Sequence, residues 1–190
     1  MITFKANYVS KAAIDRYYSQ TNSKKHPASF VRLNPTDEKD ILALLNTKNI
    51  WGKSEFGGTL YDRALFMHYD NENSEDKEIY LLTEQLEDYE NLDANKILAM
   101  GLIMTRANNF KYLTYLQVKP NHMWENQKNI YKGFRHIGTE FLNCCKEKFK
   151  NFSLVLNATK ESESFYLKNG FELINKDTRF MSYTKKLFKH

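Results

Sequence analysis

The alternation of apolar and polar positions predicts short elements in the first third of the chain. Apolar residues at helical spacing predict a helix at 10–18, and a polar stretch that ends in proline predicts a loop at 22–27. A strand is expected at 29–34, and a helix with an apolar stripe begins near Asp37. Residues 46–63, which are glycine-punctuated and aromatic, predict a further short helix and a loop.

The middle of the chain has the pattern of strands. Three apolar runs, at 78–86, 96–106 and 111–120, are separated by polar segments that suit antiparallel turns. From Ile97 to Met104 the run is apolar on both faces, which is typical of a central strand covered by helices on either side.

The last third predicts a helix at 133–150, a strand at 152–158, a short helix at 161–169 and a closing hairpin. Cys145 belongs to the apolar stripe of the long helix, so we interpret it as a core residue. The whole order predicts an α/β fold: a single domain whose mixed, mostly antiparallel sheet has helices on both faces.

Bulk composition then narrows the class of protein. The 190 residues suit one domain, and 42% hydrophobic with 14% aromatic residues argue against disorder. No apolar run reaches membrane-spanning length, and the N-terminus lacks the apolar core of a secretory signal, so no membrane contact is expected. The only cysteines, Cys144 and Cys145, are adjacent and fit neither a disulfide framework nor a metal site, which favours a reducing cytoplasm.

Charge adds one hint about partners. The net charge is +5, and the acidic residues cluster at 70–78 and 84–93, which leaves the C-terminal half basic. This pattern favours an anionic partner for that half, although ordinary solubilising charge is the more common explanation.

Three short strings in the second half carry the chemistry. Residues 116–120 read LQVKP, residues 134–142 read FRHIGTEFL, and Asn157 is followed by FYLKNGF at 165–171. Together with the element order they resemble the GNAT acetyltransferases, whose corresponding strings read L-x-V-x-P, (Q/R)-x-x-G-x-(G/A) and FY-x-K-x-GF. The resemblance covers roughly residues 29–185. It implies a GNAT-like domain at 29–190, with residues 1–28 as an N-terminal extension packed on that domain.

The resemblance implies acetyl-CoA as cofactor, held where two strands splay apart. If strands 112–118 and 152–157 diverge, backbone groups at Leu116, Gln117 and Val118 are left to bond the pantetheine arm like an added strand. The loop entering the next helix presents free N–H groups and the positive end of the helix dipole to pyrophosphate. The residues implied at that loop are Lys132, Arg135, His136, Ile137, Gly138 and Thr139, and Asn157 would position the cofactor arm.

The phosphate loop departs from the family pattern. His136 stands where the first glycine is usual, Gly133 where Gln or Arg is expected, and residues 121–132 are longer than typical. Alternatively, residues 131–133 are the original loop and residues 134–136 are inserted after it. His136 keeps its backbone N–H in either case, but its side chain narrows the site.

The resemblance gives Tyr166 the role of the acid that protonates the departing thiolate, and a phenol does stay protonated at neutral pH. The alternative is an aromatic core residue beside Phe165. Glu84, which interrupts an apolar run, is our first choice for a general base, followed by Glu125 and His122. For each of these a solvated surface charge is the more common role, and some family members need no dedicated base.

The acceptor site is expected under residues 46–63, near Trp51, Tyr61 and Arg63, the variable part of the fold. The sequence therefore predicts a cytoplasmic N-acetyltransferase, monomeric or homodimeric, in which the primary amine of a small molecule or peptide attacks acetyl-CoA directly in a ternary complex. Two alternatives stay open. One is a non-catalytic GNAT-fold module that binds acyl-CoA or a protein partner, and the other is a tRNA-directed acetyltransferase, with nucleic acid as partner.

Overall fold

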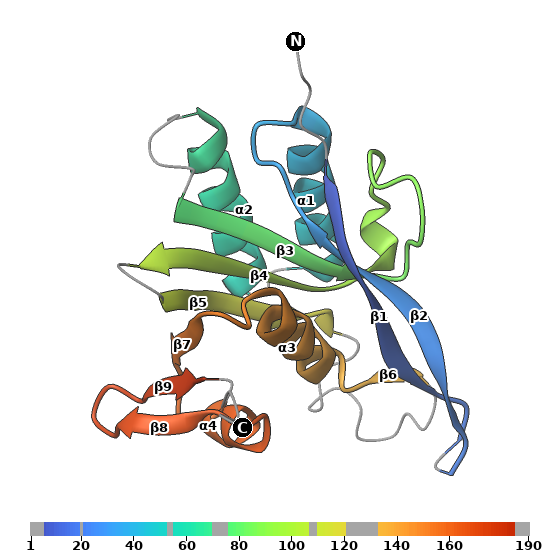
Figure 1. Cartoon of the computed structure of the whole chain (residues 1–190). Coiled ribbons are helices and arrows are strands. Elements are labelled where there is room, and N and C mark those ends of the chain that lie inside the picture. Colours follow the sequence, from blue (N-terminus) through green and yellow to red (C-terminus); the bar gives the residue numbers. More distant parts are fainter. Residues whose placement is uncertain are drawn as a thin grey trace.

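A computed structural model describes residues 6–19, 21–52, 55–69, 76–106, 110–120 and 133–184 (Figure 1). In chain order its elements are β1 (Asn7–Tyr17), β2 (Ser23–Arg32), α1 (Glu38–Trp51), α2 (Glu55–Tyr69), β3 (Lys77–Thr83), a 3₁₀ turn (Ala94–Lys96), β4 (Ile97–Arg106), β5 (Phe110–Val118), β6 (Gly133–Arg135), α3 (Ile137–Lys148), β7 (Ser153–Asn157), α4 (Glu163–Lys168), β8 (Glu172–Asn175) and β9 (Phe180–Tyr183).

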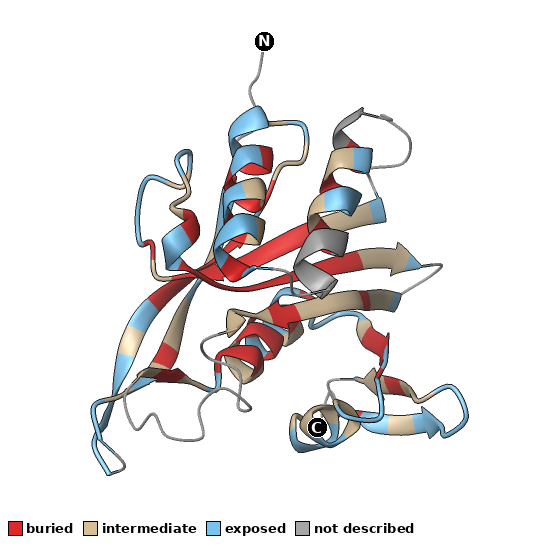
Figure 2. Cartoon of the chain, turned by 180° about the vertical axis from the view of Figure 1, so that it is seen from behind, coloured by how far each residue is buried: buried red, intermediate tan, exposed pale blue. Residues whose placement is uncertain are grey.

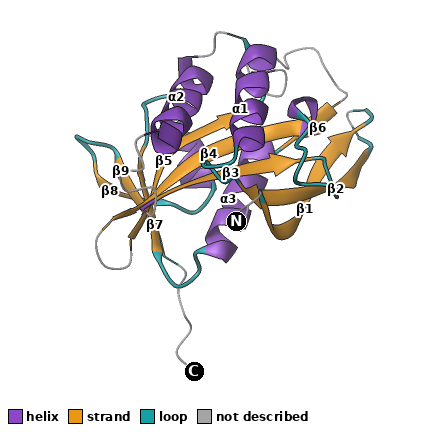
Figure 3. Cartoon of the chain, turned by 90° about the horizontal axis from the view of Figure 1, so that it is seen from above, coloured by secondary structure: helices purple, strands orange, loops and turns teal. Residues whose placement is uncertain are grey.

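The nine strands of the described residues form one sheet, in the order β6-β1-β2-β3-β4-β5-β7-β9-β8. Neighbouring strands are antiparallel, except that β5 and β7 are parallel. Helices α1 and α2 cover one face of the sheet and α3 covers the other (Figures 1 and 3). The predicted fold class, a mixed and mostly antiparallel sheet with helices on both faces, is confirmed.

The middle of the sheet is buried on both faces. Every residue of β4 from Ile97 to Ile103 is buried, so the prediction of a central strand there is confirmed (Figure 2). One apolar cluster lies under α1 and α2 and includes Leu44 and Leu60, and a second lies under α3 and includes Phe141. The core therefore has two layers separated by the sheet.

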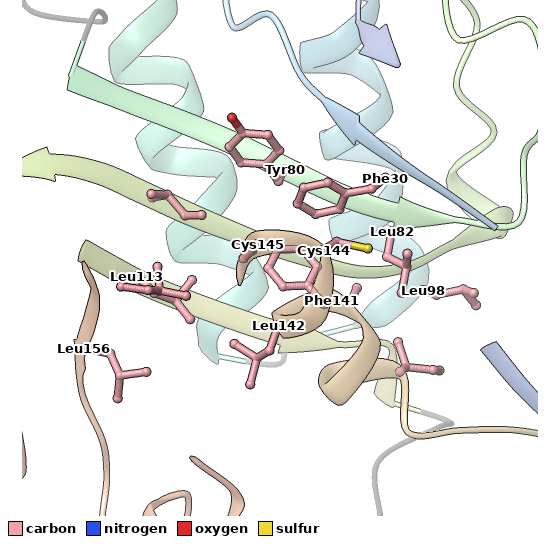
Figure 4. Close-up of a cluster of buried hydrophobic side chains, with 14 of the residues drawn as sticks. Phe30, Tyr80, Leu82, Leu98, Leu113, Phe141, Leu142, Cys144, Cys145 and Leu156 are labelled. Carbon is pink, nitrogen blue, oxygen red and sulfur yellow. The ribbon is translucent and has the colours of Figure 1, made fainter. Parts of the chain in front are cut away.

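Aromatic rings fix α3 on its face of the sheet (Figure 4). The rings of Phe30 and Tyr80 stack with centroids 5.0 Å apart, and Phe141 meets Phe30 edge-on at 5.4 Å. A Cβ on Gly101 would lie 2.7 Å from Cζ of Phe141, so this close approach of helix and strand requires glycine. Cys145 is fully buried in the same cluster, as predicted, and burial raises the pKa of its thiol.

The N-terminal prediction was wrong. Of the helix predicted at 10–18, residues 10–17 fall in β1, and of the loop predicted at 22–27, residues 23–27 belong to β2. In β1 only Ile14 is fully buried, because much of the β1–β2 hairpin extends beyond the helices, so the strand lacks a clear two-residue period (Figure 1). β2 also runs through residue 28. The division into 1–28 and 29–190 stays a prediction.

The helices begin and end at recognisable signals. Oδ1 of Asp37 accepts the N–H of Lys39 at 2.9 Å, which confirms the expected start of α1. α1 extends to Trp51 and α2 takes up most of the segment predicted as a loop. The predicted helix at 133–150 starts at Ile137, since the preceding residues form β6. Within the described residues no helix is long and apolar enough to cross a membrane.

Candidate functional site

The candidate site lies where β5 and β7 separate. Their parallel pairing starts at Phe110 and Ser153 and ends at Tyr112 and Val155, whereas β5 continues to Val118. On its other edge β5 stays paired with β4 up to Val118. The divergence of these two strands, which the resemblance implied, is therefore present. Among the described residues, the remainder of β5 has a strand neighbour on one edge alone, which leaves backbone groups on the other edge available to an extended ligand.

A β-bulge marks the point of divergence, and no signal in the sequence indicates it. Leu102 pairs with Tyr115 and Ile103 with Leu113, so Thr114 is the extra residue of β5. Oγ1 of Thr114 is buried and has no hydrogen-bond partner among the described residues. A buried hydroxyl without a partner is costly, so the bulge presents a group that a ligand or water could satisfy.

The fork itself is braced by side chains. The hydroxyl of Tyr112 donates to Oδ1 of Asn157 at 2.6 Å, and Nδ2 of Asn157 donates to the carbonyl oxygen of Thr178 at 2.7 Å. Both ends of the Asn157 amide are therefore engaged within the protein. Asn157 ties β5, β7 and the β8–β9 turn together, and its contact with a cofactor arm stays a prediction.

The loop before α3 contains a short strand, β6, that extends the sheet. Strand β6 pairs with the end of β1, with Arg135 opposite Asp15, and the guanidinium of Arg135 lies 4.5 Å from the ring centroid of Tyr17. His136 follows at φ 59° and ψ 21°, a left-handed conformation, which accounts for the usual preference for glycine at this place. Nδ1 of His136 lies 3.1 Å from Oδ2 of Asp15, and this hydrogen bond is the main cause that lowers the Asp15 pKa.

The start of α3 brings the three sequence strings together. A Cβ on Gly138 would lie 3.1 Å from Cζ of Phe165 and 3.4 Å from Cγ2 of Val118. Leu116 and Val118 pack on the same apolar cluster as α3 and α4. His136 makes no side-chain cap, so the first N–H groups of this 12-residue helix point out of its end without a side-chain acceptor from the cap residue. These N–H groups adjoin the diverging end of β5.

Tyr166 lies on α4 beside this junction. Its ring meets Phe165 at 5.1 Å and Phe171 at 5.6 Å, and no described residue bonds to its hydroxyl. Burial raises the pKa of Tyr166 to about 12, so its hydroxyl stays protonated well above neutral pH. Of the other predicted loop residues, Ile137 is a core residue and Thr139 is half-buried.

A lysine that sequence reasoning missed fastens α4 in place. Nζ of Lys146, on α3, donates to the carbonyl oxygen of Asn169 at 2.5 Å, just past the end of α4. The same ammonium lies over the rings of Tyr183 at 4.5 Å and Phe171 at 5.6 Å. Partial burial lowers the Lys146 pKa. Since Phe171 also contacts Tyr166, Lys146 helps to set the position of the α4 aromatic residues.

Other predicted site residues are not assembled with Tyr166. Oε1 of Glu84, just after β3, lies 3.1 Å from Nε2 of His26, so this carboxylate is paired two strands away from β5. Trp51 and Tyr61 belong to the apolar cluster under α1 and α2, on the opposite face of the sheet, and Arg63 is exposed on α2. The predicted residues Lys132, His122 and Glu125 lie outside the described residues.

Trp51 and Tyr61 both have packing roles. Trp51 is buried and its Nε1 has no partner among the described residues, whereas Nζ of Lys48 lies 4.7 Å from the ring centroid of Tyr61. Arg63 alone of the three is exposed to solvent.

Comparison with solved structures identifies similar folds. The chain is similar to an acetyltransferase from Thermus thermophilus (TM-score 0.54, 12% identity, 82% of this chain and 93% of that one). It is also similar to a GNAT-family protein from Desulfovibrio desulfuricans (0.52, 12%, 78% and 87%) and to the PaiA N-acetyltransferase from Thermoplasma acidophilum in complex with coenzyme A (0.51, 15%, 82% and 96%). No protein-family model and no curated protein matches the sequence.

Proposed function

We propose, from the premise that this chain has the fold of the GNAT acetyltransferases, that it transfers an acetyl group from acetyl-CoA to a primary amine. The observation that carries this proposal is the divergence of β5 from β7 directly beside the start of α3. An open strand edge and a set of free helix N–H groups then follow one another, as the pantetheine arm and the pyrophosphate of one cofactor require.

The described residues fit coenzyme A. The edge of β5 from Leu113 to Val118 would bond the amides of the arm, and the first N–H groups of α3, with Gly138 and Thr139, would hold the pyrophosphate. Gly138 leaves backbone accessible where Val118 and Phe165 meet. Acetyl-CoA would supply an activated thioester when bound. The guanidinium of Arg135 stacks on Tyr17, and its contact with the pyrophosphate stays a prediction.

Tyr166 would stabilise the leaving thiolate. The amine nitrogen attacks the thioester carbonyl, a C–N bond forms, and the C–S bond breaks with its electron pair on sulfur. A free thiol has a pKa of about 8.5. A phenol whose pKa is raised to about 12 is a weaker acid than that thiol, so we propose that Tyr166 donates a hydrogen bond to sulfur without giving up its proton completely.

The proton of the attacking ammonium needs another destination. Glu84 is paired with His26 and separated from Tyr166, so we propose that solvent takes this proton, through water at the splayed strands. The acceptor amine would approach β5 near Thr114, whose buried hydroxyl has no partner among the described residues. Arg63, exposed on α2, remains a proposed contact for the acceptor.

Calorimetry with coenzyme A and acetyl-CoA tests this function. We expect a dissociation constant in the micromolar range, which corresponds to about 8 kcal/mol of binding free energy. As a matched ligand control, adenosine 3′-phosphate 5′-diphosphate has the three phosphates of coenzyme A without the arm and should bind at least about tenfold more weakly, because it cannot use the edge of β5.

A measurement of turnover distinguishes an enzyme from a non-catalytic binding module. Thiol release from acetyl-CoA should depend on an added amine, measured with a panel of polyamines, peptides and amino sugars. Tight coenzyme A binding with no amine-dependent release would instead support a non-catalytic acyl-CoA module. If neither coenzyme A nor acetyl-CoA gave heat at about 100 times the expected dissociation constant, both interpretations of the site would be wrong.

A further inference from the structure

Three strands at one edge of the molecule form a charged arm, which we define as residues 7–32 and 133–136. It comprises β1, β2 and β6, and the end of the β1–β2 hairpin extends away from the helices (Figure 1). That end is mostly exposed (Figure 2). The arm is a continuation of the sheet, joined to it where β2 pairs with β3.

The arm holds a large share of the chain's positive charge. It contains six of the 28 Lys and Arg residues but one of the 23 Asp and Glu residues, so its formal charge is +5. The remaining 22 basic and 22 acidic residues cancel. The arm is therefore a positively charged extension of the sheet, with Arg16 and Lys24 as cross-strand partners on one face and Lys11 on the other.

Most of these cations have no carboxylate to neutralise them. The single acid, Asp15, is shared by Lys25 at 3.0 Å and His136 at 3.1 Å. Arg32 pairs with Glu78, at the inner end of the arm. Four cations have no carboxylate partner among the described residues. They are Lys11, Arg16, Lys24 and Arg135.

Aromatic rings orient the two arginines. The guanidinium of Arg16 lies 5.6 Å from the ring centroid of Tyr18 and 5.4 Å from that of Phe134, and Arg135 lies over Tyr17. Stacking fixes the plane of a guanidinium and leaves its N–H groups free for an anion. Tyr18 is itself 44% exposed, so its ring is accessible to a planar partner.

We propose that this arm binds the phosphodiester backbone of a nucleic acid. β1 has 11 residues and spans about 36 Å, so cations distributed over both faces of the arm suit an extended polyanion better than one small anion. Stacked arginines suit phosphate recognition, and an exposed tyrosine suits stacking on an unpaired base. The cations on β1 and β2 lie outside the junction of β5, α3 and α4, so this inference does not depend on acetyl transfer.

Fluorescence anisotropy of the full chain tests the arm. The probe is a labelled single-stranded RNA of about 20 nucleotides, longer than a site of up to ~16 nucleotides. Four contacting cations predict a plot of log K against log salt with a slope of about −3. The triple variant Lys11→Gln/Arg16→Gln/Lys24→Gln should reduce that slope by about 2 and weaken binding at low salt by at least about tenfold.

The matched control removes the same charge elsewhere. Lys148→Gln/Lys160→Gln/Lys176→Gln changes three exposed lysines outside the arm and should bind the RNA as the wild type does. Because Arg16 packs on Phe134, the double variant Lys11→Gln/Lys24→Gln covers the case in which the triple variant unfolds. It should reduce the slope by about 1.4.

Several results would overturn the proposal. One is equal weakening by the control triple, since binding would then follow net charge alone. Another is displacement of the RNA by saturating coenzyme A, which would make the arm a cofactor site. Binding of the arm to phosphatidylserine vesicles without binding to RNA would assign it to membranes. Unchanged coenzyme A calorimetry of the triple variant would show that a failure here leaves the proposed acetyl transfer intact.

Discussion

The hydroxyl of Tyr112 donates a 2.6 Å hydrogen bond to Oδ1 of Asn157. Asn157 lies two residues beyond Val155, which is the last residue of β7 that pairs with β5. Nδ2 of the same amide reaches the carbonyl oxygen of Thr178. The amide thus joins the two strands of the fork to the C-terminal hairpin, and the separation of the strands is a fixed feature of the fold.

Removing this link should lower the stability of the fold more than it lowers the affinity for a ligand. We expect Asn157→Ala to lower the free energy of unfolding by about 1–2 kcal/mol and Tyr112→Phe by about 1 kcal/mol, with a coupling of at least about 0.5 kcal/mol in the double variant. Denaturant unfolding measures all three. A loss of coenzyme A affinity without loss of stability in Asn157→Ala would instead make the side chain a cofactor contact.

Gly138 should tolerate little added volume. Its neighbours, Val118 and Phe165, leave a new Cβ 3.1 Å from the nearest carbon, so Gly138→Ala requires the Phe165 ring to shift by a few tenths of an ångström. We expect a loss of about 1 kcal/mol in stability and at least about tenfold weaker coenzyme A binding, measured by calorimetry. Phe165→Leu in the Gly138→Ala background should restore stability. If Gly138→Val bound coenzyme A normally, the proposed site would be wrong.

Tyr166→Phe should separate packing from chemistry. Phenylalanine keeps the ring contacts with Phe165 and Phe171 but removes the hydroxyl, so stability should stay within about 0.5 kcal/mol and kcat should fall by about 10². KM for acetyl-CoA should change little. Because burial raises the pKa of Tyr166 to about 12, wild-type activity should show no loss from this group below about pH 10. Unchanged turnover would contradict the role given to the hydroxyl.

Buried Asp40 should make stability depend on pH. It lies in the first turn of α1 with Oδ2 2.7 Å from the N–H of Asn34, and burial raises its pKa from 3.8 to about 7. The folded state therefore holds a proton that the unfolded state releases between these values, so this contribution to stability is complete below pH 3.8 and is lost as the pH rises to 7. Between pH 5 and pH 8 the loss should be up to about 3 kcal/mol.

Asp40→Asn should remove this dependence. Asparagine keeps an oxygen for the Asn34 N–H and has no proton to lose, so unfolding by denaturant should give similar free energies at pH 5 and pH 8. Asp177→Asn, in the exposed turn after β8, is the matched control and should keep the wild-type difference. A wild-type pH dependence in Asp40→Asn would assign the effect to another group.

The parts of the fold that could be predicted are those with a strong apolar period. The runs around Ile97 and the stripe of α3 are buried along most of their length, so their patterns are complete. β1 is different, since Ala13, Ile14 and Tyr17 mimic a helix and much of the hairpin meets solvent on both faces. β6 has three residues and forms only because β1 is there to pair with it.

The sequence motifs of the site could be predicted, but the side-chain hydrogen bonds and ion pairs around it could not. The motifs at Val118, Gly138 and Phe165 do meet, because their order along the chain determines where a strand end, a helix start and the next helix lie. The pairings of Glu84 with His26 and of Asn157 with Tyr112 join residues that are distant in sequence. No local pattern encodes such pairs. Each changes the function that its residue can serve.

The pairing of β1 with β6 has a consequence for synthesis of the chain. Asp15 faces Arg135 across 120 residues, so β1 leaves the ribosome well before β6, the strand that covers its outer edge. At roughly 5–20 residues per second this interval is about 6 to 24 s. Throughout it, we expect the positive charges along β1 and β2 to disfavour pairing of this open strand edge with other chains, since charged side chains on edge strands oppose edge-to-edge association.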